Sequence, residues 1–162
     1  MVILGIDPGL AIVGWGVLEC VRGKFRVLGY GSIRTEAKTP VEERIAQIYD
    51  SMNVIIDKYR PEVMAVEELF WNTNQKTGIS VAEARGTILL AAHKKGLKIY
   101  EYTPLQVKQA VVGYGRAEKR QIMEMTRILL HMEKIPRPDD AADALALAIC
   151  HAYAAGSPLG LM

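Results

Sequence analysis

Ile3-Leu4-Gly5-Ile6-Asp7-Pro8-Gly9 is an apolar run that ends on a carboxylate and a turn. The run from Val2 to Ile6 has no polar alternation, which is typical of a strand buried on both faces of a sheet. Pro8-Gly9 turns the chain, because proline has no N–H for a neighbouring strand and glycine tolerates a positive φ. Asp7 therefore stands at the carboxyl end of a central strand, where open α/β sheets place their sites. Alone, an Asp before Pro-Gly is more often a turn former than a catalyst.

A second buried run, Glu62 to Glu67, also ends on an acid. The two runs are separated by an amphipathic segment from Pro40 to about Tyr59, which predicts a crossover helix. A strand, a crossover helix and another strand imply a parallel pair. Because parallel neighbours of equal length end at the same edge, we expect Asp7 and Glu67 to lie close together.

The remaining elements complete an α/β pattern. Short connections predict that Val2–Asp7 continues as an antiparallel meander through two strands, Ile12–Cys20 and Lys24–Ile33. A polar loop, Leu69–Lys76, follows the second acid, and Leu97–Tyr102 reads as a last strand. Further helices are expected over Gly78–Lys95, from Thr103-Pro104 to a break at Gly113, over Ala117–His131 and from Asp139 to Ala155.

Composition indicates one globular domain. The chain has 162 residues, of which 50% are hydrophobic and 23% charged, enough to bury a full core. We assign residues 1–156 to one domain and 157–162 to a short C-terminal tail. Cys20 and Cys150 lack the spacing of a disulfide framework and indicate a reducing compartment. We expect neither a signal peptide nor a membrane span.

Charge is distributed unevenly along the chain. Residues 1–75 carry 8 Lys and Arg against 10 Asp and Glu, whereas residues 76–137 carry 12 against 5. A basic middle between acidic ends suits a polyanion held by one part of the chain while acids elsewhere hold metal. Solvated helix faces would give the same pattern.

The last predicted helix begins with acids and continues as an apolar helix. Asp140 and Asp143 are three residues apart and share a face. A carboxylate on so apolar a helix is costly to bury without a partner, and a metal ion would be one. Alternatively, Asp139 or Asp140 serves as the N-cap. His151 lies on the same face, where a packed or surface histidine is commoner than a ligand.

Four carboxylates therefore emerge as one candidate site: Asp7, Glu67, Asp140 and Asp143. Oxygen ligands without a Cys and His cluster favour Mg²⁺, or alternatively Mn²⁺, over zinc. Two such ions are a standard arrangement for in-line displacement at a phosphodiester. No Ser-His-Asp or Cys-His arrangement and no Walker loop is present in the sequence.

Aromatic and basic residues near these acids are candidate nucleic-acid contacts. Phe70 or Trp71 could stack on unpaired bases, although a ring pair packed in the core is an equal alternative. Cations at a helix start oppose the macrodipole, so Lys119 and Arg120 suit phosphate contact or surface solubility. The full set of candidate DNA contacts is Phe70, Trp71, Lys76, Lys108, Arg116, Lys119 and Arg120.

Five motifs occur in order along the chain: Gly5-Ile6-Asp7-Pro8-Gly9, Ala65-Val66-Glu67-Glu68-Leu69-Phe70, Gln106-Val107-Lys108-Gln109-Ala110-Val111-Val112-Gly113, Ala117-Glu118-Lys119 and Asp140-Ala141-Ala142-Asp143-Ala144-Leu145-Ala146. Nearly end to end, this series resembles the RuvC family of Holliday-junction resolvases. The resemblance implies an RNase H-like fold, with a mixed five-stranded sheet flanked by helices.

The resemblance also implies an activity. The four acids would bind Mg²⁺, with two ions per subunit, and a homodimer would resolve four-way junction DNA by paired symmetric nicks that leave 5′-phosphate and 3′-hydroxyl ends. Phe70 resembles the base-stacking aromatic, and Lys108 and Lys119 resemble residues that hold scissile-side phosphates. Expected partners are the branch-migration complex of RuvA and RuvB, in the bacterial cytoplasm.

Three alternatives remain at this stage. Asp7-Pro8-Gly9 also resembles the first phosphate loop of actin-like ATPases and sugar kinases, but 162 residues leave no room for the second lobe. A non-catalytic junction-binding module is disfavoured because all four acids are retained. Another RNase H-like nuclease would share the fold, and only the ordered motifs argue against it.

Overall fold

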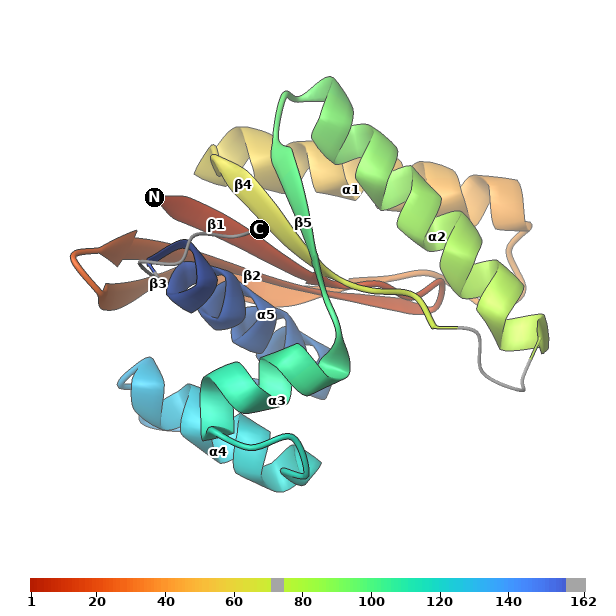
Figure 1. The fold of residues 1–162 in the computed structure, drawn as a ribbon. Helices are drawn as coiled ribbons and strands as arrows, with labels where there is room; N and C mark the ends of the chain where they lie inside the picture. The colour runs from red at the N-terminus through yellow and green to blue at the C-terminus, as the bar shows by residue number, and fades with distance from the viewer. Residues whose placement is uncertain (71–74, 157–162) are drawn as a thin grey trace.

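A five-stranded mixed sheet forms the middle layer of the molecule (Figure 1). The computed structural model describes residues 1–70 and 75–156, with the backbone alone for residues 75 and 76. The strands lie in the order β3-β2-β1-β4-β5, which confirms the predicted sheet. Their bounds are β1 (Val2–Asp7), β2 (Ile12–Val21), β3 (Lys24–Arg34), β4 (Val63–Glu67) and β5 (Lys98–Tyr102). β1, β2 and β3 form the antiparallel meander, and β4 and β5 run parallel to β1.

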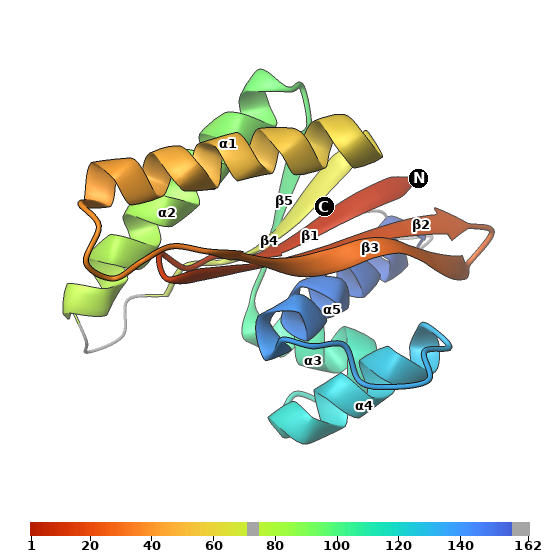
Figure 2. The same cartoon turned by 180° about the vertical axis from the view of Figure 1, so that it is seen from behind.

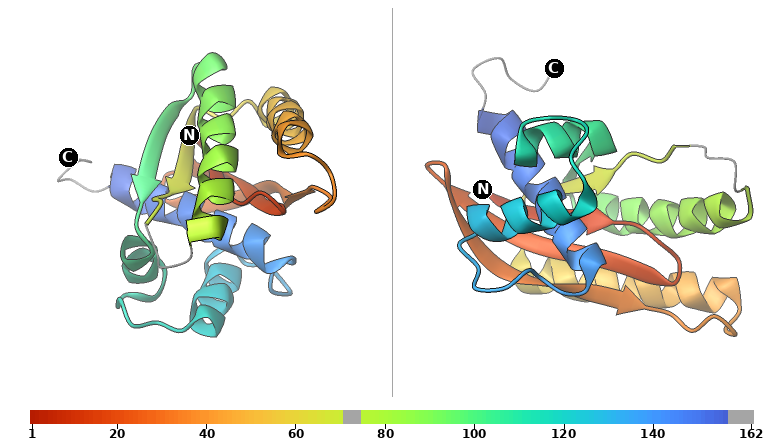
Figure 3. Two further views of the ribbon diagram at one scale, coloured as in Figure 1. Left: turned by 90° about the vertical axis from the view of Figure 1, so that its right-hand side faces the viewer. Right: turned by 90° about the horizontal axis from the view of Figure 1, so that it is seen from below.

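Helices cover both faces of this sheet, as Figures 1 and 2 show. One face carries α1 (Val41–Tyr59) and α2 (Gln75–Lys94), and the other carries α5 (Asp139–Gly156). On the outer side of α5 lie α3 (Pro104–Val112) and α4 (Lys119–Leu129) (Figure 3). Among the described helices, none is both long and apolar enough to cross a membrane.

The alternation of side chains along β1 divides the core in two. Leu4 and Ile6 belong to the core under α1 and α2, whereas Ile3 belongs to the core under α5. Successive strand residues point to opposite faces, so a strand with apolar residues at every position supplies both cores. This explains why the central run carries no polar residue before Asp7.

α5 lies unusually close to β1 and β2. A Cβ on Gly5 would stand 1.9 Å from the Ala144 carbonyl oxygen, and a Cβ on Gly14 would stand 2.0 Å from the Asp140 carbonyl oxygen. Side chains larger than hydrogen are therefore excluded from these positions, and the helix backbone rests on the strands. This contact fixes the distance between the sheet and the helix that carries Asp140 and Asp143.

Several predicted helix bounds need correction. α2 begins at Gln75 rather than Gly78, so Lys76 belongs to a helix and not to the preceding loop. Its polar first turn has the composition of a loop, which is why the sequence pattern misplaces the start. Pro40 is the N-cap of α1 and not its first helical residue. α4 spans Lys119–Leu129 rather than Ala117–His131, because the Gln121 side chain accepts from the Glu118 N–H at its start.

Candidate active site at the carboxyl ends of β1 and β4

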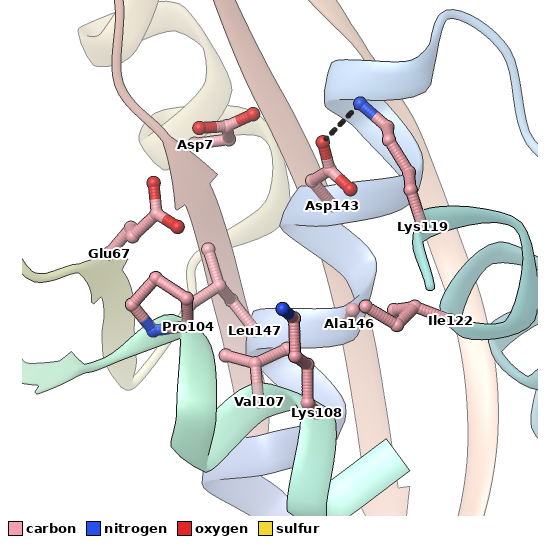
Figure 4. A pocket seen from close by; sticks show the side chains of 10 residues that line it. All are labelled: Asp7, Glu67, Pro104, Val107, Lys108, Lys119, Ile122, Asp143, Ala146 and Leu147. Atoms are coloured by element: carbon pink, nitrogen blue, oxygen red, sulfur yellow. Dashed lines mark ion pairs between the residues drawn. The ribbon is translucent and has the colours of Figure 1, made fainter. Parts of the chain in front are cut away.

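Asp7 and Glu67 end two neighbouring parallel strands. β1 and β4 pair in parallel, with Ile6 opposite Val66, so the two acids follow at the same edge of the sheet. Both line a cavity of about 260 Å³, together with Asp143 from α5. In Figure 4 the carboxylates of Asp7 and Glu67 lie on one side and that of Asp143 on the other. The convergence expected from the equal lengths of the two strands is therefore observed.

Asp140 lies near the cavity without lining it. Its carbonyl and Cβ rest against Gly14 of β2, one helical turn before Asp143. Its charge still contributes to raising the pKa of Asp7. The four predicted acids thus share one region of the molecule, and three of them, Asp7, Glu67 and Asp143, face the cavity.

The electrostatics of the site favour bound positive charge. Burial raises the pKa of Asp7 from 3.8 to about 8, with further contributions from the negative charges of Glu67, Asp143 and Asp140. Burial also raises the pKa values of Glu67 and Asp143, and the negative charge of Asp143 adds to the effect on Glu67. Carboxylates that repel one another in a partly desolvated cavity are stabilised in their charged form by nearby cations.

Lys119 forms an ion pair with Asp143. Its Nζ lies 3.3 Å from Asp143 Oδ2 and 4.0 Å from Asp139 Oδ2. Its positive charge lowers the pKa of Asp143 and partly offsets the effect of burial. Lys108 of α3 also lines the cavity, whose apolar wall consists of Pro104, Val107, Ile122, Ala146 and Leu147. The site therefore joins acids from β1, β4 and α5 to lysines from α3 and α4.

The donor set fits a hard divalent cation in its chemistry. Asp7, Glu67 and Asp143 offer carboxylate oxygens, which are the ligands that Mg²⁺ and Mn²⁺ prefer. A divalent cation would also relieve the repulsion that raises the pKa of Asp7. In the conformation of residues 1–70 and 75–156, however, no three His, Cys, Asp or Glu side chains are close enough to hold an ion. Asp143 instead contacts Lys119.

Among the described residues, the candidate DNA contacts Phe70, Arg116 and Arg120 lie outside the cavity lining. Phe70 is 54% exposed after β4, so its ring is not packed in the core. Arg116 and Arg120 are exposed between α3 and the first turn of α4. Trp71 and the side chain of Lys76 lie outside the described residues.

The sequence analysis missed Arg85 and the apolar residues that line the cavity, among them Leu147. The Arg85 Nε donates to the Glu67 carbonyl at 3.3 Å, and its Nη2 lies 3.0 Å from Glu101 Oε1. Nothing in the sequence marks Arg85, because the contact depends on how α2 crosses the sheet. Leu147 lines the cavity four residues after Asp143, and helical spacing would have identified it.

Comparison with known proteins shows which family this chain matches. The family model "Crossover junction endodeoxyribonuclease RuvC" matches residues 3–151. A protein of that name from Halothermothrix orenii is 58% identical over 151 residues, covering 93% of this chain and 92% of the relative. Another from Alkaliphilus metalliredigens is 54% identical over 153 residues, covering 94% and 93%.

Solved structures of RuvC proteins are also similar to this chain. Thermus thermophilus RuvC superposes with a TM-score of 0.88 at 38% identity, covering 96% of this chain and 95% of that chain. The T. thermophilus RuvC complex with Holliday junction substrate gives 0.88 at 36% identity over the same shares of the two chains. The yeast mitochondrial Holliday junction resolvase Ydc2, with a TM-score of 0.66 at 14% identity, shares the fold.

These matches confirm the predicted RNase H-like fold and leave the phosphate-loop ATPase alternative without support. A family model that covers almost the whole chain and relatives above half identity are decisive together. The chain belongs to the RuvC family of crossover junction endodeoxyribonucleases.

Proposed function

We propose that this protein resolves four-way DNA junctions by paired symmetric nicks, each formed by hydrolysis of one phosphodiester at the Asp7–Glu67–Asp143 cavity. The observation that carries the proposal is the convergence of acids from three elements beside Lys108 and Lys119. A scissile phosphate is an anion and would be repelled by the acids alone, so the two lysines supply the charge that makes the cavity accessible to DNA.

Metal would complete the site. RuvC-family enzymes are metal-dependent nucleases, and we propose that Asp7, Glu67, Asp140 and Asp143 hold Mg²⁺, or alternatively Mn²⁺, with two ions per subunit. Such ions supply activation of the attacking water and stabilisation of the leaving 3′-oxygen. The products would then carry 5′-phosphate and 3′-hydroxyl ends.

The chain's own residues would orient the DNA. Lys108 and Lys119 reach the cavity from α3 and α4 and would hold the phosphates on the scissile side. The exposed Phe70 ring would stack on an unpaired base near the junction centre. Trp71, the next residue, is the alternative stacking ring. Lys76, Arg116 and Arg120 would extend the contact, since they belong to the basic segment 76–137.

Membership in the family supports a proposal for the assembly, partners and location of the protein. We propose that the protein acts as a homodimer, because two symmetric nicks require two equivalent sites. Its partners would be junction DNA and the branch-migration complex of RuvA and RuvB. The bacterial cytoplasm is the proposed location.

The variant Asp7→Asn tests the assignment of the site. It keeps the side-chain size and removes one negative charge, so we expect normal folding, retained junction binding and loss of cleavage by at least about 100-fold. Cleavage of a synthetic junction and its affinity in Ca²⁺ are the two measurements. The control is Asp50→Asn, an exposed acid on α1, across the sheet from α5. Cleavage at the wild-type rate by Asp7→Asn would remove Asp7 from the site.

A further inference from the structure

His151 is a buried histidine that forms no part of the cavity. It is 1% exposed on α5, and its Nδ1 lies 2.8 Å from the hydroxyl of Tyr102, which is 4% exposed at the end of β5. The Tyr100 ring stacks against the imidazole with a centroid distance of 4.4 Å. Two aromatic residues of one strand therefore hold a single histidine of the helix that packs over the sheet.

Tyr102 and His151 form an uncharged pair. Burial raises the pKa of Tyr102 above its usual range, so the phenol keeps its proton. Burial also lowers the pKa of His151 and favours the neutral ring. One hydrogen bond therefore joins two neutral groups, and the tautomer of the imidazole decides which of them donates. Removing either partner would leave a buried polar atom without its hydrogen bond, which is costly.

Tyr102 lies beside Glu67, the acid that ends β4. It pairs in register with Glu67, and its carbonyl accepts a hydrogen bond from the Glu68 N–H at 2.9 Å. The next residue, Thr103, caps α3, the helix that carries Lys108. A shift of Tyr102 would therefore move both Glu67 and the start of α3.

His151 lies on the helix that carries Asp140 and Asp143. It follows Asp143 by eight residues on one continuous helix, or about 12 Å along the axis. Near its start, this helix rests on Gly14 through the Asp140 carbonyl. It also rests on Gly5 of β1 through the Ala144 carbonyl. The Tyr102 hydrogen bond adds a polar attachment further along the helix, to the edge strand β5 beyond β4.

We propose that Tyr102 and His151 are positioning residues that hold Asp143 at its working distance from Glu67, by joining β5 to α5 through one buried hydrogen bond. This inference rests on the proposed role of Glu67 and Asp143 as metal ligands. Neither Tyr102 nor His151 lines the cavity, so both act through the elements that they connect.

Tyr102→Phe is the sharpest test, because it removes one oxygen and keeps the ring. We expect the half-saturating Mg²⁺ concentration for cleavage to rise, and single-turnover cleavage to fall, each by about tenfold, the range seen when outer partners of metal ligands are changed. Junction affinity should stay within about twofold, since no phosphate contact changes. The matched control is Tyr153→Phe on the same helix, whose ring contacts Phe25 far from the acids.

A second pair of variants separates positioning from packing. His151→Asn places an amide oxygen near the position of Nδ1 and can still accept from Tyr102, whereas His151→Leu cannot. Partial rescue of the Mg²⁺ dependence by His151→Asn relative to His151→Leu is expected, although the asparagine fills less space. Equal defects in these two variants would overturn the role of the hydrogen bond.

The affinity for Mn²⁺, measured by calorimetry without DNA, tests the inference independently of cleavage. Weaker Mn²⁺ binding by Tyr102→Phe at temperatures where the variant is fully folded supports positioning. A lowered melting temperature with unchanged Mn²⁺ affinity and unchanged Mg²⁺ dependence would show that the pair only stabilises the fold. If the wild-type protein bound Mn²⁺ but cut no junction, the proposed function would fail while this comparison would still decide the inference.

Discussion

At Asp7, burial and the repulsion of neighbouring acids act in the same direction. Both raise the pKa of this carboxyl, to about 8. The folded protein without metal therefore binds a proton that the unfolded chain has released at neutral pH. Such a site favours the binding of a cation. Without a cation, ionisation of Asp7 lowers the free energy of unfolding, so stability depends on pH.

The sign of that dependence can be stated. Between an unfolded pKa of about 3.9 and the folded pKa of about 8, the folded state binds more protons, so its stability falls as pH rises. Asp7→Asn removes this loss. We expect the free energy of unfolding of the variant in EDTA to exceed that of the wild type by up to about 5 kcal/mol at pH 8, with the gain shrinking to about 1.5 kcal/mol at pH 5. Urea unfolding at several pH values measures it, and a gain that is independent of pH would contradict it.

The ammonium group of Lys119 contacts the Asp143 carboxylate and is also the proposed contact of a DNA phosphate. The Lys119 side chain is exposed towards solvent. If it also contacts a DNA phosphate, Lys119→Ala should reduce the slope of log affinity against log salt by about one unit. The control is Lys24→Ala, an exposed lysine at the β2–β3 hairpin, at the opposite end of the sheet. An unaltered slope would separate Lys119 from the phosphates.

At the scale of elements, the sequence predicted the strands well and the helix starts less well. β1 and β4 are apolar at every buried position, so their type, pairing and terminal acids could be predicted. The first turn of α2 is polar, with the composition of a loop, and it was misplaced.

Contacts between residues that are far apart in the chain could not be predicted from the sequence. The Tyr102–His151 hydrogen bond joins residues 49 positions apart, and the Arg85 contact with Glu67 depends on the packing of α2. Periodicity describes one element at a time, whereas these contacts arise from the way two elements cross. Asp7 and Glu67 could be singled out because each ends an apolar strand, and Asp140 and Asp143 because they begin an apolar helix.

The close approach of the α5 backbone to Gly14 of β2 leads to a prediction about stability and cleavage. In Gly14→Ala the new methyl group would overlap the Asp140 carbonyl, at 2.0 Å. The helix must then move outward, with an expected loss of about 1–3 kcal/mol of unfolding free energy and a larger proportional loss of cleavage.

The control for this prediction is Gly86→Ala on α2, where a Cβ meets nothing within 4 Å. That change should leave cleavage intact and stabilise the helix by up to about 1 kcal/mol. Denaturant unfolding and junction cleavage are measured on both variants. Wild-type stability and cleavage in Gly14→Ala would show that the close approach of α5 is not required.

At the scale of the whole molecule, the fold places opposite charges next to each other. The acids come from β1, β4 and α5, and the lysines come from α3 and α4 within the basic segment 76–137. Asp7 and Asp143 are 136 positions apart in the chain, and the layered sheet brings them to one cavity. A polyanion can therefore approach the basic side while its phosphate meets the acids.

The most direct test of a metal-dependent junction resolvase at this site is cleavage of a synthetic four-way junction with a mobile core. The assay is run with and without Mg²⁺ and beside linear duplex. We predict paired, symmetric nicks that DNA ligase can seal, that require the metal and that are absent from the duplex. Equal cutting of junction and duplex, or cutting in EDTA, would contradict a metal-dependent junction resolvase at this site.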